Sequence, residues 1–308
     1  MTKAEFQQKI NNILNANSGY GFEAYACLQN SRCVKFILED KDNNSFKDVI
    51  ADKIASCVSD IFLSDIELKQ VADIHDNTNS FYEIVQNEDY SPFDFLESPE
   101  DSAFSDSEKS FLTGMAFKFS INNNFFWAYQ QIYPVTIPQK KSTYLYAGKN
   151  DIYKEFTKEL IIIDYRVDLI LIDSSIITKN IGLLQNKFGF ETFIRNESQK
   201  TIELIAEMDI IDDMSKIIDF EGKEKLTNAK KLMKIKNSPV LHMKNTVLIE
   251  RLKTLSRYKD KIKINNNVIQ IKTNKDVIEL LKILNDDYLV SELTNKNYDS
   301  PSKMLDEN

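Results

Sequence analysis

The sequence of 308 residues contains few of the residue types from which metal, redox and histidine-dependent sites are built. The cysteines are Cys27, Cys33 and Cys57; they lack CxxC spacing and lie in apolar segments, which favours packing as small hydrophobic side chains. The histidines are His75 and His242, too few for a histidine-rich metal centre and without a nucleophile motif beside them. We therefore expect no metal ion and no other cofactor.

Glycine-rich loops and long apolar runs are also missing. The seven glycines form neither a Walker loop nor a dinucleotide-binding pattern, so nucleotide hydrolysis is not expected. The strongest apolar run, Leu160 to Ile172, is interrupted by Asp164, Arg166 and Asp168 and falls short of the roughly 18 apolar residues of a membrane helix. The first residues have no apolar core of a signal peptide. These absences predict a cytoplasmic protein.

Hydrophobic periodicity predicts an α+β fold, with a mainly antiparallel sheet in the first part and a helix-rich, basic C-terminal part that includes a hairpin. We divide the chain into three regions on this basis. They are an N-terminal α+β region (1–110) that ends in an acidic linker, an antiparallel sheet region (111–180), and a helical basic C-terminal region (181–308).

The N-terminal region shows helical spacing over Lys3–Leu14 and again over Phe46–Ile61, where Ser45 is the expected cap. Two strands, Phe22–Leu28 and Cys33–Glu39, are predicted between the helices. Residues 87–110 hold eight acidic side chains and one lysine. Such a charge run predicts a solvated linker or long loop. A sharper alternative is that it folds over the basic segment as a mimic of a polyanion.

Six short strands are predicted in the sheet region, separated by asparagine, proline and glycine turns; they are Met115–Ile121, Phe125–Ile132, Thr143–Ala147, Leu160–Ile163, Val167–Ile172 and Ser175–Thr178. Trp127, Tyr129 and Tyr133 fall at or near alternate positions, which places them towards one face of the sheet. Core packing is the expected role of these rings, and stacking on nucleic-acid bases is the alternative.

The C-terminal region shows a helical pattern from Gly189 onwards, with most of the acidic charge of this half in Thr201–Met208 and Ile210–Phe220. It then becomes strongly basic. The stretch Lys223–Lys275 carries thirteen lysines and two arginines against three acidic residues, a net charge of +12, whereas the rest of the chain carries −20. Its lysines gather on sides of two helices, the second over Lys244–Tyr258, and on a hairpin that follows. A charge run is often only a solvated surface, but this segregation favours contact with phosphates.

Lysine outnumbers arginine thirteen to two in this stretch, which favours contact with the DNA backbone over base reading. The side chains that we expect to contact phosphates are Lys223, Lys230, Lys231, Lys234, Lys253, Arg257, Lys261 and Lys263. One alternative is a metal-dependent nuclease that uses the fragment Glu221-x-Lys223, although acids at an expected helix start also have a structural role. Another is a docking surface for a protein or for anionic lipid. We expect no catalytic residues and no metal ligands.

Four segments carry a resemblance to a known family: Phe126–Pro134, the strand pair Asp168–Asp173 with Ile177–Asn180, Phe190-Glu191, and the block Leu284–Thr294, which is followed by Tyr298 and Lys303. Over residues 115–303 the chain resembles the KwaB family of the Kiwa anti-phage defence system. The resemblance implies a cytoplasmic protein that binds DNA without nuclease chemistry and acts with a membrane-embedded partner, KwaA. We therefore expect a non-enzymatic defence effector that binds phage DNA, is recruited to the inner membrane by its partner, and forms a homo-oligomer.

Overall fold

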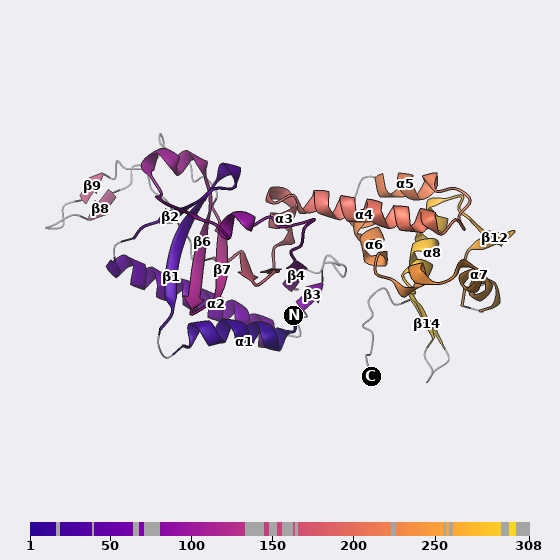
Figure 1. Ribbon diagram of the computed structural model, residues 1–308, viewed down its shortest axis with the longest axis horizontal. Coiled ribbons are helices and arrows are strands. Elements are labelled where there is room, and N and C mark those ends of the chain that lie inside the picture. Colours follow the sequence, from indigo (N-terminus) through magenta and orange to yellow (C-terminus); the bar gives the residue numbers. More distant parts are fainter. Residues whose placement is uncertain are drawn as a thin grey trace. The chain divides into compact units, whose positions relative to one another are not determined.

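The computed structural model describes residues 1–16, 19–38, 40–63, 68–70, 81–132, 145–147, 153–155, 163, 166–222, 226–255, 257–258, 261–290 and 296–299 (Figure 1). The chain divides into two compact units. Unit 1 contains Met1–Leu68 and Thr78–Asn180, and unit 2 contains Lys69–Asn77 and Ile181–Asn308. Unit 1 is built on a mostly antiparallel sheet and unit 2 is mainly helical with a small hairpin, which confirms the predicted α+β class.

A nine-stranded sheet has the order β3-β4-β11-β10-β7-β6-β1-β2-β5. The strands are β1 (Gly21–Leu28), β2 (Cys33–Phe36), β3 (Leu68–Gln70), β4 (Phe81–Val85), β5 (Glu100–Ala103), β6 (Leu112–Ile121), β7 (Asn124–Gln131), β10 (Leu169–Ile172) and β11 (Ser175–Thr178). The long central strand β6 pairs antiparallel with β1 on one side and β7 on the other, and β5 joins β2 in parallel. A separate hairpin pairs β8 (Leu145–Ala147) with β9 (Tyr153–Glu155). The predicted strand Leu160–Ile163 lies almost entirely outside the described residues.

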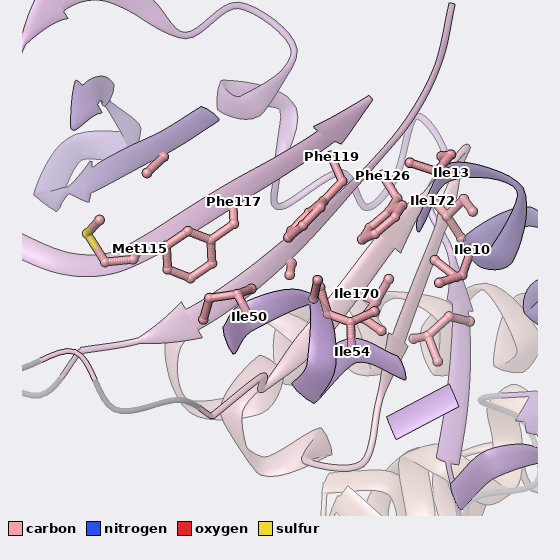
Figure 2. Packing of buried hydrophobic residues seen from close by; sticks show 14 of the residues in the cluster. Ile10, Ile13, Ile50, Ile54, Met115, Phe117, Phe119, Phe126, Ile170 and Ile172 are labelled. Atoms are coloured by element: carbon pink, nitrogen blue, oxygen red, sulfur yellow. The ribbon is translucent and has the colours of Figure 1, made fainter. Parts of the chain in front are cut away.

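Helices α1 (Lys3–Leu14) and α2 (Asp40–Leu63) pack on one face of this sheet. Figure 2 shows isoleucines of both helices beside Phe117 and Phe119 of β6 and Phe126 of β7. The bounds of α1 agree with the prediction, because Thr2 and Glu5 form a capping box that begins the helix. Helix α2 begins at Asp40, so Ser45, which was expected to cap the helix, lies inside it.

The acidic segment 87–110 is packed on the sheet, so the prediction of a solvated linker was wrong. Its apolar side chains Phe93 and Leu96 are buried, and the Phe93 ring lies 5.5 Å from the ring of Tyr129. Strand β5 of the same segment joins the sheet edge. Tyr129 is 1% and Trp127 5% exposed, which confirms core packing for these rings and leaves neither ring free to stack on bases; Tyr133 lies outside the described residues.

Unit 2 has its own apolar core, formed by residues from all of its longer helices and from the hairpin. The elements are α3 (Ile181–Lys187), α4 (Phe190–Glu207), α5 (Ser215–Gly222), α6 (Leu226–Ile235), α7 (Asn245–Thr254), β12 (Lys263–Asn265), β13 (Val268–Gln270), α8 (Asn274–Leu284), β14 (Tyr288–Val290) and β15 (Asn297–Asp299). Helix α4 begins at Phe190, in agreement with the helical pattern expected from Gly189 onwards. Within the described ranges, no helix combines the length and apolar character needed to cross a membrane.

Candidate nucleic-acid interface

Helix α6 carries three of the predicted phosphate contacts. Its core-facing side chains Ala229 and Leu232 are buried, so the helix is held to unit 2 along one side. Lys231 is exposed, and Lys230 and Lys234 are half-buried beside it. The lysine-bearing side of this helix therefore faces outward from the core, as the helical spacing predicted. Lys223 lies outside the described residues.

A nearly buried carboxylate joins α6 to α4. Glu197 of α4 is 7% exposed; it pairs with Lys236, just after α6, and lies 2.9 Å from Lys200. Burial by itself raises the pKa of Glu197, but the hydrogen bonds and charges of the two lysines outweigh it and hold the pKa below its ordinary value. Lys236 thus stabilises unit 2, although it belongs to the same basic stretch as the predicted contacts.

A second group of predicted contacts lies around α7 and the β12–β13 hairpin. Lys253 is exposed on α7, and its Nζ donates to the Oδ1 of Asn267, 2.7 Å away in the hairpin turn. Asn266 and Asn267 have φ of 50° and 64°, the left-handed conformation that a two-residue hairpin turn requires. This turn confirms the predicted hairpin. It leaves Lys263, on β12, exposed.

Arg257 does not belong to α7, because the helix ends at Thr254 and not at Tyr258 as predicted. The hydroxyl of Thr254 donates back to the carbonyl of Glu250 at 2.8 Å, and Leu255 is already extended, with φ −77° and ψ 124°. Arg257 follows in a turn, where its guanidinium lies 4.9 Å from the ring centre of Tyr258. Arg257 therefore packs on an aromatic ring and does not share the helical face on which Lys253 lies.

Two buried tyrosines organise the basic residues at this end of unit 2. The rings of Tyr258 and Tyr288 meet edge to face with their centres 6.0 Å apart, and the Nζ of Lys261 lies 4.8 Å from the Tyr288 centre. The Tyr258 hydroxyl donates to Asp286 at 2.9 Å. Burial, together with this hydrogen bond, raises the pKa of Tyr258 to about 12. Lys282 also lies over Tyr288, at 5.9 Å.

The structure thus divides the predicted residues into two groups. The α6 group contains Lys230, Lys231 and Lys234, and the α7–hairpin group contains Lys253, Arg257, Lys261 and Lys263. In the view of Figure 1, α8 lies between α6 on one side and α7 with β12 on the other. Residue spacing did not predict the tyrosine pair, although Tyr288 lies in the block Leu284–Thr294 that carries the family resemblance.

Glu221 of the nuclease alternative lies near the C-terminal end of α5, so the expected helix start at this position was wrong. Its Oε1 accepts a hydrogen bond from the Ser198 hydroxyl at 3.2 Å and lies 3.4 Å from the guanidinium of Arg195. Arg195 also pairs with Glu191 one turn earlier on α4. These contacts give Glu221 a structural role that joins α5 to α4.

Comparison with known proteins matches a family described as Kiwa protein KwaB-like to residues 109–294. The chain belongs to this family. The family region contains every described member of the α6 and α7–hairpin groups. The Kiwa protein KwaB of Escherichia coli O55:H7 (strain RM12579 / EPEC) is 30% identical over 159 residues, which cover 50% of this chain and 50% of that protein. The chain thus matches over about half the length of this curated relative. No solved structure matches it.

Proposed function

We propose that this KwaB-like protein acts in anti-phage defence by binding DNA without regard to sequence through the basic surface of unit 2. The observation that carries the proposal is the exposure of Lys231, Lys253, Lys261 and Lys263 in a stretch with a net charge of +12. Lysines spaced along helices and a hairpin suit contacts to backbone phosphates, which carry no sequence information. Membership of a Kiwa family supports the role in defence.

DNA binding of this kind predicts a steep dependence on salt. Fluorescence anisotropy with a 30-bp duplex and with a single strand of equal length should show affinity falling by several powers of ten from low to physiological salt. Reversing Lys231, Lys253, Lys261 and Lys263 to Glu should abolish binding while circular dichroism shows an intact fold. Reversal of the exposed Lys53 on α2 of unit 1 is the control and should have little effect. A salt-insensitive interaction would contradict the proposal.

We propose that the protein binds DNA without cleaving it. The engagement of Glu221 by Ser198 and Arg195 supports this, because a carboxylate that joins two helices is poorly placed to hold a catalytic metal. Incubation of labelled duplex with the protein and Mg²⁺ should leave the DNA intact. Cleavage that disappears in Glu221→Gln, in a variant that still binds DNA, would establish the nuclease alternative.

We further propose that the protein is cytoplasmic, forms a homo-oligomer, and is recruited to the inner membrane by the membrane-embedded partner KwaA. The resemblance to KwaB proteins supports this arrangement. The competing interpretation is that the basic surface binds anionic lipid directly. Co-sedimentation with vesicles should show no binding unless KwaA is present. Binding to vesicles with anionic lipid, and not to neutral ones, in the absence of KwaA would favour the lipid interpretation.

A further inference from the structure

A cavity of about 220 Å³ lies between α7, the turn that follows it, and the C-terminal end of α8. Its apolar lining includes the buried side chains Val240, Leu248, Leu252 and Ile283. Leu255, 37% exposed, is one of the solvent-exposed lining residues, together with Pro239 and Arg251. The volume is smaller than the roughly 300–1,000 Å³ of pockets for drug-sized ligands, so the cavity suits a single small group.

Two arginines give this apolar cavity a positive character. Arg251 and Arg257 both line it, and neither forms an ion pair with any residue in the described part of the chain. Among the described residues, the Nε of Arg257 is buried and has no hydrogen-bond partner. The carboxylate in the lining, Asp286, accepts the hydroxyl of Tyr258. The cavity is therefore lined by aliphatic side chains, and its two arginines and one aspartate give it a net charge of one positive unit. The Nε–H of Arg257 is a donor without an acceptor among the described residues.

We propose that this cavity receives one unstacked nucleotide of the bound DNA, with the base between the aliphatic side chains and the phosphate on Arg251 and Arg257. The proposal rests on the proposed DNA binding and deepens it. Arg257 is itself a predicted phosphate contact, and the Tyr258 ring beneath its guanidinium keeps that planar group in place. Guanidinium groups bind phosphate through paired donors and also stack on bases.

The position of the cavity favours a nucleotide over a peptide terminus with an apolar side chain, which has similar chemistry. Arg257 of the α7–hairpin group lines the cavity itself, so DNA bound through Arg257 lies at the cavity. Unstacking costs least for a base that is unpaired or terminal. The protein should therefore prefer DNA that contains such a nucleotide, although fully paired DNA still binds through its phosphates.

The test compares a blunt 20-bp duplex with the same duplex carrying one unpaired nucleotide. The unmodified protein should bind the second at least about fivefold more tightly, the low end of what one stacked base contributes. Leu255→Trp, which fills the cavity from its solvent side, should abolish this preference and leave affinity for the blunt duplex unchanged. Leu255→Ala is the matched control and should retain the preference. If the tryptophan variant does not fold, Arg251→Gln takes its place and should reduce the preference.

Equal affinity of the unmodified protein for the two duplexes, or a preference that survives in Leu255→Trp, would overturn the proposal. A second arm uses dAMP and N-acetyl-leucine as probes, detected by ligand-observed NMR. Binding of N-acetyl-leucine but not dAMP would assign the cavity to a peptide terminus and overturn the proposal. Binding of dAMP, without a higher affinity for the duplex that carries the unpaired nucleotide, would assign the cavity to free nucleotides and also overturn the proposal. If neither duplex binds, the proposed function fails, and dAMP binding that is lost in Leu255→Trp then assigns the cavity to free nucleotides and not to a nucleotide of bound DNA.

Discussion

The division of the basic residues into two groups predicts how the affinity for DNA depends on salt. Each lysine or arginine that contacts a phosphate contributes about −0.9 to the slope of log affinity against log salt. If the α6 group and the α7–hairpin group both bind one duplex, their seven members give a slope of about −6. Affinity should then fall by about four powers of ten between 50 and 200 mM salt.

Neutralising each group separately tests whether the contributions of the two groups to the salt slope are additive. Replacing Lys230, Lys231 and Lys234 by Gln should change the slope to about −4, and replacing the four members of the α7–hairpin group should change it to about −3. Gln keeps much of the side-chain length, so the packing of the half-buried Lys230 and Lys234 changes little. The assay is fluorescence anisotropy of a labelled 30-bp duplex at six salt concentrations, with thermal unfolding as a check on each variant.

The slopes distinguish three arrangements. Additive changes mean that one duplex contacts both groups at the same time. A slope that responds to only one set of substitutions assigns DNA binding to that group and leaves the other as a solvated surface or a docking site. A slope that neither set changes would refute the reasoning, because the phosphates would then be neutralised by residues outside both groups.

Two further predictions concern the scaffold. Glu197→Gln should lower the free energy of unfolding by about 1–2 kcal/mol at neutral pH, whereas the exposed Glu203→Gln should be nearly neutral. Because the pKa of Glu197 is lowered in the folded state, the stability that its carboxylate contributes is present above the ordinary pKa of 4.5 and is lost as the pH falls through the folded value. The free energies of unfolding of variant and parent, measured by urea titration, should therefore converge in acid. Gly114→Ala would place its Cβ 2.3 Å from the Tyr129 hydroxyl and should cost about 1–3 kcal/mol; Gly222→Ala, with open space around it, is the control, and equal unfolding midpoints would contradict the packing argument.

Elements determined by short-range signals could be predicted from the sequence. Helix α1 has apolar positions at helical spacing and a threonine and glutamate that cap its start, so both of its ends agree with the prediction. The hairpin turn at Asn266 and Asn267 follows from the tolerance of asparagine for positive φ. The helical side that carries Lys231 was also predictable, since the 3.6-residue period places Lys231 on a different side of the helix from the buried Ala229 and Leu232.

Features that depend on distant partners could not be predicted in this way. Residues 87–110 have the composition of a linker, and their packing rests on Phe93 meeting Tyr129, thirty-six positions further along the chain. Helix α7 ends four residues before Tyr258, and the ring of Tyr258 packs against Tyr288, thirty positions further along the chain. Lys236 resembles its neighbouring lysines in sequence, and only the approach of Glu197 from α4 gives it a structural role.

The family match begins at residue 109, yet the sheet it contains is incomplete without the residues before it. Strand β6 pairs with β1 along nearly its whole length, and α1 and α2 cover its apolar face at Phe117 and Phe119. A protein limited to the family region would expose an unpaired strand edge and an uncovered apolar surface, both of which favour aggregation. Unit 2 differs, because its core comes from residues beyond Ile181. The basic surface therefore rests on a core of its own, and substitutions on it should leave the stability of unit 1 unchanged.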